Sequence, residues 1–432
     1  MSRLTTYLQS QVRRLLLARV GRNGIDLSQL EKVPERLSWP LQRNGMNPIE
    51  RLAELREREP IAKLTSFLGL TIWVVSGEAE ARAVLADTTS YSNDIRPFMG
   101  SRGSTIDGDI GGLGFTDPPD HTRLRRLLTP EFTMRRLERL RPRIAAIVEQ
   151  QLDVVQEQAR AEGGVVDLVP TFAFPVPFLV ICELLGLPDE DRDTFRQLGS
   201  ARFDLSTGGT GVFGAVSGSR SFLMDATRRQ REQPGEGLIG QIIREHGDDI
   251  NDFELAGLAD GVFTGGLETS ASMLALGTAV LLEHPDDYRA VAEEPAVVER
   301  TVEELLRYLS VVQVSFPRIP RQDIEVGGRR IAKGDILICH LAGANRDARS
   351  GPGLEDFDAT RRPTSHLAFG HGFHRCVGAE LARMELRAAF PALARRLPDL
   401  QVASNRLAYR GNSIVYGLDS LPVRLQPADA LV

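Results

Sequence analysis

Phe369-Gly-His-Gly-Phe-His-Arg-Cys-Val-Gly378 is the stretch of sequence that decides the fold. It places one thiol, Cys376, after a loop punctuated by glycines, and the residues from Val377 onward are predicted to form a helix. A cysteine at a helix start lies near free N–H donors and the positive end of the helix dipole, and both favour the thiolate. Glycines let backbone N–H groups turn toward the sulfur, and Gly378 leaves room for a flat group against the helix.

The same stretch resembles the haem-binding loop of the cytochrome P-450 family, usually written F-G-x-G-x-H-x-C-L-G, and departs from it only at Val377. A thiolate is a good axial ligand for haem iron because it pushes electron density toward O–O cleavage. The resemblance implies that Cys376 ligates the iron and that Phe369, His374 and Gly378 lie against the haem. The alternative is that Cys376 is a buried free thiol packed as a small hydrophobic residue.

The composition is that of an ordinary globular protein. Of 432 residues, 42% are hydrophobic and 25% are charged, and the net charge of −6 gives no reason to expect nucleic acid as a partner. The cysteines are odd in number and sparse (Cys182, Cys339 and Cys376), which argues against a disulfide framework and for the cytoplasm. No apolar run reaches the ~20 residues that span a bilayer, so we expect no transmembrane segment and a soluble, bacterial-type protein.

No linker divides the chain, so we expect a single catalytic domain over residues 46–432, preceded by an N-terminal extension, residues 1–45. Within the extension, residues 5–20 can form a short basic amphipathic helix that either touches a membrane or partner or packs on the domain. Residues 205–221 are rich in glycine and serine and predict a mobile loop, which in the family connects two helices over the substrate channel.

Helical patterns dominate after residue 120, whereas shorter β-rich runs occur at 61–75 and 324–341. In the second run, Gly327-Gly328 between alternating residues marks a hairpin turn. The fold class predicted is therefore mainly α with a small β region.

Residues 252–284 are predicted to form one long buried helix, because they are apolar nearly all round and Pro285 follows them. Asn251 or Asp252 can cap the start. Gly265-Gly266 stands in the middle, although each mid-helix glycine costs ~1 kcal/mol against alanine. Two adjacent glycines let a flat cofactor approach closely and let the backbone open around a small ligand.

Glu268 and Thr269 follow these glycines, and a carboxylate beside a hydroxyl makes a proton-delivery pair. The segment resembles the family's oxygen-activation motif, A/G-G-x-E/D-T-T, in which the threonine hydrogen-bonds dioxygen at the haem. The resemblance assigns that role to Thr269 and the acid's role to Glu268, with Ser270 in place of the second threonine. Taken alone, the segment can equally be plain core with a satisfied polar pair.

Glu304-Leu-Leu-Arg307 places an acid and a base on one helical face, a pattern that usually marks a weak surface pair. In the cytochrome P-450 family the corresponding pair is buried and is completed by a second arginine, which Arg361 matches. Three buried charges have to satisfy one another. The resemblance therefore assigns Glu304, Arg307 and Arg361 to folding of the haem core.

The segment from Asp117 opens a helix with prolines at its start, and His121 and Arg125, four residues apart, share a face. The resemblance implies that these two side chains hold the haem propionates together with Arg318 and His374. For each residue alone, a solvated charge is the alternative.

The resemblance covers roughly residues 46–425 and implies the triangular-prism cytochrome P-450 fold, with haem b between the long helix and the cysteine loop. The reaction implied is monooxygenation, with O2 as co-substrate. The chain shows no flavin or ferredoxin domain, so electrons from NAD(P)H have to arrive through a ferredoxin and ferredoxin reductase, or a flavodoxin-type partner. A basic surface near Cys376 would suit an acidic ferredoxin; the candidates are Arg123, Arg126, Arg135, Arg136 and Arg375. A monomer is expected.

By the same resemblance, the substrate pocket draws on the 93–113 loop, the Gly265-Gly266 wall and a set of apolar side chains: Val312, Val314, Phe316, Ile414 and Val415. A hydrophobic small molecule is expected, with fatty acid, terpenoid, steroid and polyketide all open. Ser310-Val311-Val312 stands where relatives often carry Ser-Pro-Val. An H2O2-using peroxygenase is one alternative, although such relatives replace the acid–threonine pair; a non-catalytic haem carrier or gas sensor is another.

Overall fold

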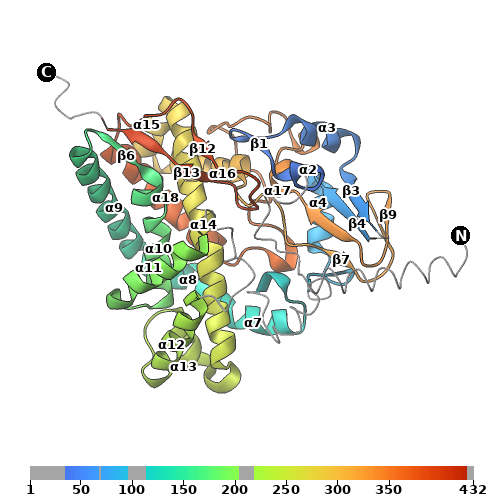
Figure 1. The fold of residues 1–432 in the computed structure, drawn as a ribbon, viewed down its shortest axis with the longest axis horizontal. Coiled ribbons are helices and arrows are strands. Elements are labelled where there is room, and N and C mark those ends of the chain that lie inside the picture. Colours follow the sequence, from blue (N-terminus) through green and yellow to red (C-terminus); the bar gives the residue numbers. More distant parts are fainter. Residues whose placement is uncertain (1–34, 68–69, 96–112, 204–217, 426–432) are drawn as a thin grey trace, which may run out of the picture.

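The computed structural model describes residues 35–67, 70–95, 113–203 and 218–425. A helix-rich part contains α9, α10, α14 and α18, and a smaller part carries most of the strands, including β3, β4 and β9 (Figure 1). The predicted fold class, mainly α with a small β region, is confirmed.

The long helix α14 (Asp252–Glu283) is the centre of the helix-rich part, as predicted. Asn251 accepts a hydrogen bond from the Glu254 N–H, and the Glu254 carboxylate accepts one from the Asn251 N–H, so a reciprocal capping box fixes the start. Pro285 begins the next helix and prevents α14 from continuing. By length and composition α14 is apolar enough to cross a membrane, but 72% of its most apolar window is buried inside the protein.

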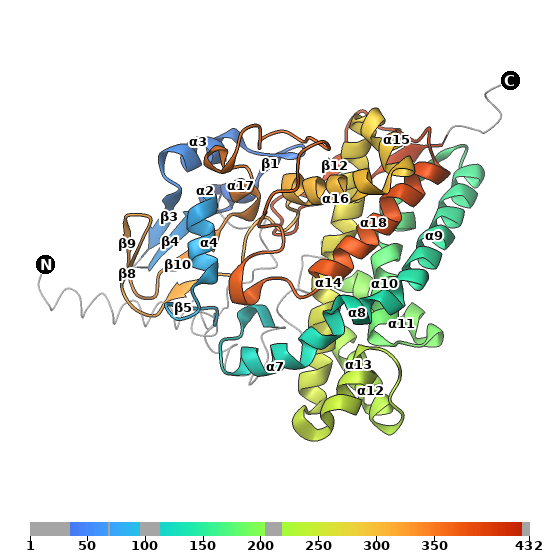
Figure 2. The same ribbon diagram turned by 180° about the vertical axis from the view of Figure 1, so that it is seen from behind.

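Helices α10 (Pro175–Leu185), α12 (Gly218–Glu232), α16 (Pro295–Leu309) and α18 (Ala379–Arg396) all pack on α14. Seen from behind, α18 crosses close to α14, with α9 (Arg141–Ala161) at the outer edge (Figure 2). The remaining α-helices among the described residues are α2 (Glu35–Ser38), α3 (Glu50–Arg58), α4 (Glu78–Ala86), α7 (Asp120–Leu128), α8 (Met134–Leu137), α11 (Asp189–Phe203), α13 (Leu238–His246), α15 (Pro285–Glu293) and α17 (Leu341–Ala344).

The main sheet has the order β10-β4-β3 and joins distant parts of the chain. Strand β4 (Leu70–Val75) pairs antiparallel with β3 (Ile61–Phe67) and parallel with β10 (Ile336–Cys339), with Ile336 opposite Ile72. The predicted hairpin is present as β8 (Ile324–Val326) and β9 (Arg329–Ile331). Gly327 and Gly328 have φ of 55° and 70°, which a two-residue turn of this kind requires.

The other strands form short pairs or triplets. They are β1 (Arg43–Asn44) with β2 (Asn47–Pro48), β5 (Tyr91–Ser92) with β7 (Ile319–Pro320), β12 (Ala408–Tyr409) with β13 (Leu418–Ser420), and β14 (Pro422–Arg424) between β6 (Val165–Asp167) and β11 (Gln401–Val402).

One prediction needs correction. Residues 218–221 were expected to belong to the loop 205–221, but they form the first turn of α12. The Ser219 hydroxyl lies 3.0 Å from the buried Asp260 carboxylate of α14, so packing on α14 overrides the weak helix propensity of glycine and serine. Residues 204–217 and 5–20 lie outside the described residues. The last part of the predicted extension packs on the domain, with Trp39 buried and Arg43 Nε 2.8 Å from Gln313 Oε1.

Candidate active site

The cysteine loop is closed by a hydrogen bond from the Cys376 N–H to the Phe369 carbonyl, 2.9 Å long. Gly372 has φ 70°, and a Cβ there would lie 2.5 Å from the Leu85 carbonyl oxygen, so a side chain would not fit. Helix α18 begins at Ala379, two residues later than predicted, because Val377 and Gly378 form a turn.

Cys376 differs from the other two cysteines in its access to solvent. Its side chain is exposed, whereas Cys182 and Cys339 are buried and burial raises the pKa of each of their thiols to about 12. Protein atoms nevertheless surround Cys376, and this desolvation raises the pKa of its thiol, against a hydrogen bond from the Gly378 backbone and the charges of Arg125 and other arginines. The N–H effect expected from the sequence is present through the Gly378 backbone, and the arginine charges add to it, but desolvation of the thiolate outweighs both.

Four basic side chains gather beside this loop. His121 of α7 is fully buried, and its ring lies 4.3 Å from the ring of His374. Burial lowers the pKa of His121 to about 4 and that of His374 to about 3, and Arg125 and Arg318 add electrostatic repulsion to both. Burial also lowers the pKa of both arginines. The positive charge of this region therefore comes from the two arginines, and Asp117 is the acid that acts on His121 and Arg318.

These features fit haem b. Among the described residues, neither ring nitrogen of His121 has a hydrogen-bond partner, which is costly for a buried polar group. Two propionates would supply acceptors and negative charge to this cluster. A Cβ built on Gly265 or Gly370 would meet nothing within 4 Å, and one on Gly378 would meet only the Phe132 ring at 3.7 Å and the Cys376 sulfur at 4.0 Å. These surfaces leave space for a flat ring.

On α14, the helix continues unbroken through Gly265-Gly266. Thr269 Oγ1 donates to the Gly265 carbonyl at 2.7 Å. Glu268 also has a partner outside α14, because its Oε1 accepts a hydrogen bond of 2.5 Å from Arg410 Nη1. Burial raises the pKa of Glu268, and the Arg410 charge opposes that increase.

Ser270 has a contact that the sequence did not predict. Its hydroxyl hydrogen-bonds the carboxyl group of Glu385, which lies on α18 and is 2% exposed. Burial raises the pKa of Glu385 to about 8, and the Ser270 hydrogen bond opposes this increase. No local sequence signal points to either partner, because Arg410 and Glu385 lie more than 100 residues beyond α14.

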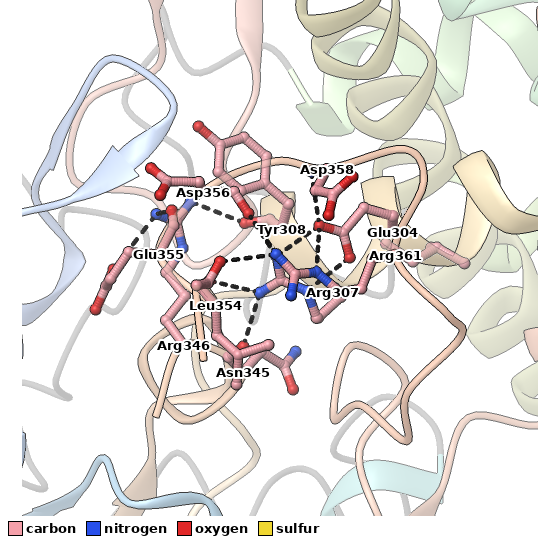
Figure 3. Close-up of polar contacts among 12 residues, drawn as sticks. Glu304, Arg307, Tyr308, Asn345, Arg346, Leu354, Glu355, Asp356, Asp358 and Arg361 are labelled. Carbon is pink, nitrogen blue, oxygen red and sulfur yellow. Dashed lines mark hydrogen bonds and ion pairs between the residues drawn. The ribbon is translucent and has the colours of Figure 1, made fainter. Parts of the chain in front are cut away.

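Glu304, Arg307 and Arg361 are brought together as the resemblance implied (Figure 3). Glu304 and Arg307 share two hydrogen bonds of 2.8 Å, and their side chains are 3% and 2% exposed. Arg361 Nε donates to Glu304 Oε1 at 3.1 Å. Arg307 also donates to three backbone carbonyls, those of Asn345, Leu354 and Asp356. We call the side chains of Glu304, Arg307 and Arg361 the Glu304 cluster.

Comparison with known proteins identifies the family. The model of the cytochrome P-450 family matches residues 225–398. Cytochrome P-450 FAS1 of Rhodococcoides fascians is 40% identical over 393 residues, which cover 89% of this chain and 98% of that protein. The chain belongs to the cytochrome P-450 family.

Further comparisons agree. The 6-deoxyerythronolide B hydroxylase of Saccharopolyspora erythraea is 35% identical over 86% of this chain and 95% of that protein. The solved structure of OxyE, a cytochrome P-450 involved in teicoplanin biosynthesis, superposes with a TM-score of 0.80 at 36% identity, covering 89% of this chain and 99% of that one. The protein is accordingly a cytochrome P-450 monooxygenase, of a family that binds haem, uses O2 and in bacteria typically takes electrons from redox partners.

The predicted substrate residues of this cytochrome P-450 lie on two neighbouring segments, 312–316 and 414–415, here called the predicted substrate wall. Val312, Val314 and Phe316 are more exposed than the buried Val311 and Gln313 that alternate with them. Val312 forms an isolated antiparallel bridge with Val415. Phe316 and Ile414 are 47% and 38% exposed, which is unusual for large apolar side chains. Of the 93–113 loop, residues 96–112 lie outside the described part; Phe115, just beyond it, packs edge-on against Phe316 at 4.7 Å.

Two of the five arginines expected to attract an acidic partner are already paired. Arg123 contacts Glu254, and Arg136 contacts Glu131 and Glu245. Their charges are compensated within the protein. The other three of the five arginines are exposed and remain candidates for contact with an acidic partner: Arg126, Arg135 and Arg375.

Two open clefts occur elsewhere. One of about 950 Å³ lies at the C-terminal end of α14 beside Tyr288 and Tyr409, and one of about 690 Å³ lies beside Arg231 and Phe253. None of the candidate site residues lines either cleft, so neither replaces the assignment above.

Proposed function

We propose that the protein inserts one oxygen atom of O2 into a hydrophobic small molecule, by hydroxylation or epoxidation, with Cys376 as the thiolate ligand of haem b. For a hydroxylation the balance is RH + O2 + NAD(P)H + H⁺ giving ROH + H2O + NAD(P)⁺. The observation that carries this proposal is the group of basic side chains around His121, which has no hydrogen-bond partner within the described part of the chain, beside the one exposed cysteine of the three.

Bound haem would supply oxygen activation, and the protein's own residues would position it. His121, Arg125, Arg318 and His374 would neutralise the propionates, and Gly265, Phe369 and Gly378 would border the ring. Gly266, which was also expected at the ring, faces another way, because a Cβ there would lie 3.0 Å from Ile181 of α10. A thiolate at Cys376 would be favoured once the iron replaces the thiol proton.

The proton path would run through Thr269. Its hydroxyl proton points to the Gly265 carbonyl, so the lone pairs of Oγ1 are available to accept from a donor. A proton passed to Thr269 from Glu268, directly or through water, would let the hydroxyl release its own proton toward the reacting oxygen. Both residues would then act by moving protons, and neither would hold the cofactor.

The substrate would contact Val312, Val314, Phe316, Ile414 and Val415. These side chains offer no charge, so apolar contact has to provide most of the affinity. Two relatives bear names that point to natural products, 6-deoxyerythronolide B and teicoplanin. We therefore favour a bulky hydrophobic molecule of secondary metabolism.

Electrons would come from a ferredoxin and its reductase. The purified protein with NADPH and a screened substrate is expected to turn over negligibly, and adding the two partners should restore product formation. Turnover without a partner would refute this part of the proposal. H2O2-driven turnover at the partner-driven rate would instead favour a peroxygenase, and haem without turnover under either condition would favour a carrier or sensor.

The surface near Cys376 on which a ferredoxin would dock can be tested by reversing the charge of one of its exposed arginines. Arg375→Glu should slow reduction by an acidic ferredoxin severalfold at low ionic strength, and the difference should shrink as salt rises. Arg330→Glu is the matched control, because Arg330 is 84% exposed but lies on β9, in the strand-rich part. Equal effects of the two variants would exclude docking near Cys376.

A further inference from the structure

The carboxylate proposed to feed protons to Thr269 is held by an arginine from a distant loop. Arg410 Nη1 lies 2.5 Å from Glu268 Oε1, across 142 residues of sequence. The two side chains are 11% and 19% exposed, so the pair is largely shielded from water. A guanidinium stays charged in proteins, and it favours the ionised, acceptor-only form of the carboxylate it contacts, against the opposite effect of burial. In this contact Glu268 is an acceptor, and in its ionised form it has no proton to donate.

Arg410 has a second carboxylate within reach. Its Nε lies 3.3 Å from Asp419 Oδ1, and the Asp419 side chain is 60% exposed. Asp419 belongs to β13, and Arg410 follows β12 in the same hairpin, where its N–H donates to the Gly417 carbonyl at 2.9 Å. The hairpin therefore offers Arg410 a partner that does not involve α14.

The loop between these strands, residues 410–417, connects α14 to the predicted substrate wall. At its base, a Cβ on Gly417 would lie 2.6 Å from Ser272 Oγ of α14, so the backbone packs tightly there. At its tip, the Ile414 carbonyl accepts from the Gln313 N–H at 2.9 Å, and Val415 bridges Val312. A molecule that pushes on Ile414 therefore pushes on the loop that carries Arg410.

We propose that Arg410 is a positioning residue that withholds Glu268 from proton delivery until a substrate displaces the loop 410–417, so that Arg410 releases Glu268 and keeps only its contact with Asp419. This inference rests on the proposed proton role of Glu268. Its value to the enzyme is that protons reach the oxygen site only when a substrate is there to be oxidised. Without this control, the wasteful reaction O2 + NAD(P)H + H⁺ giving H2O2 + NAD(P)⁺ competes.

Thermodynamic linkage gives a test that does not depend on turnover. If a ligand that occupies the predicted substrate wall has to break the Glu268–Arg410 pair, the cost of breaking the pair weakens binding of that ligand. A variant without the pair does not bear this cost, so it should bind the ligand more tightly by the corresponding factor. Arg410→Gln should therefore lower the Kd of a bulky apolar haem ligand, clotrimazole, by about three- to tenfold, a range suited to a partly shielded ion pair. Asp419→Asn removes the alternative partner and should raise that Kd.

Binding is measured by the Soret shift of the haem-loaded protein, with imidazole as the control ligand. Imidazole lacks the bulky aryl groups of clotrimazole, so its Kd should be the same in all variants. Arg406→Gln, an exposed arginine before the same hairpin, is the control substitution and should change neither Kd. A purely structural Arg410 would weaken or leave unchanged the binding of clotrimazole, and either result would overturn the inference.

A turnover measurement completes the test. Arg410→Gln should divert electrons to H2O2, and Arg410→Lys, which keeps the charge, should restore part of the coupling. If clotrimazole affinity does not respond to Arg410→Gln while imidazole binds normally, the inference fails and the proposed function stands. If imidazole produces no Soret shift in the unmodified protein, the proposed haem site itself is wrong.

Discussion

Replacing Glu304 with alanine is expected to destabilise the haem core severely. The change removes four hydrogen bonds, two from Arg307, one from Arg361 and one from the Asp358 N–H. It leaves the Arg307 guanidinium 2% exposed, with three carbonyl partners but no opposite charge. Breaking a buried pair by removing one partner costs about 3–5 kcal/mol. A domain has a total stability of only about 5–15 kcal/mol, so much of the margin would be lost.

The measurement is urea unfolding followed by far-ultraviolet circular dichroism and by Soret absorbance. A loss of about 3–5 kcal/mol should lower the urea midpoint by roughly 1 M, since m is about 1–3 kcal/mol/M for small proteins and larger for longer chains. If Glu304→Ala does not accumulate, Arg361→Met provides a milder break, because Arg361 is 16% exposed and makes only one of the four bonds.

The chain contains its own control for this prediction. Glu138-Arg-Leu-Arg141 has the same spacing as Glu304-Leu-Leu-Arg307, and its two side chains also share two hydrogen bonds, of 2.7 and 2.8 Å. Its side chains are 48% and 57% exposed, so burial is the main difference. Glu138→Ala should leave the urea midpoint unchanged. Equal midpoints for Glu138→Ala, Glu304→Ala and the unmodified protein would refute the idea that burial gives the Glu304 cluster its importance.

Three further outcomes are expected. Cys376→Ala should abolish the red-shifted Soret band of the reduced carbon monoxide complex, whereas alanine variants of the two buried cysteines should keep it; a normal band in Cys376→Ala would end the ligand assignment. Thr269→Ala should retain haem and ligand binding but release H2O2 in place of product, and an unchanged ratio of product to NAD(P)H would contradict its proton role. Burial would raise the pKa of Glu303, but hydrogen bonds from His366 and Arg383 outweigh it and lower the pKa to about 2. The stabilisation that ionised Glu303 contributes to the folded protein is therefore fully present above the ordinary glutamate pKa of about 4.5, and it is lost as the pH falls toward 2. Glu303→Gln should flatten that decrease in a pH series of thermal unfolding, and an unaltered slope would contradict the pKa shift.

The sequence predicted those parts of the fold that local patterns determine. The start of α14 was predicted at Asn251 or Asp252, of which Asn251 is the cap, and the β8–β9 turn was predicted from Gly327-Gly328. Spacing alone did not predict burial, because Glu138 and Glu304 have the same pattern and opposite environments. Only the family resemblance separated them, by supplying Arg361 as a third member.

The site contacts that the sequence missed are those made across long stretches of chain. Neither the Glu268–Arg410 pair nor the Ser270–Glu385 hydrogen bond leaves a periodic or motif signal, because each joins elements that only the tertiary fold brings together. For the same reason, Arg123 and Arg136 looked like free surface charges, although acids on other segments compensate them.

The parallel pairing of β4 with β10 has a consequence for synthesis of the protein. Ile72 and Ile336 lie side by side in the sheet, but about 260 residues separate them in the chain. At a translation rate of about 5–20 residues per second, β4 emerges roughly 13–50 seconds before its partner strand exists. During that interval Leu-Thr-Ile-Trp-Val-Val has a free edge and a high β propensity, a combination that favours aggregation. Yield should therefore be set as much by protection of this strand on the ribosome, through chaperones or slower expression, as by the stability of the finished enzyme.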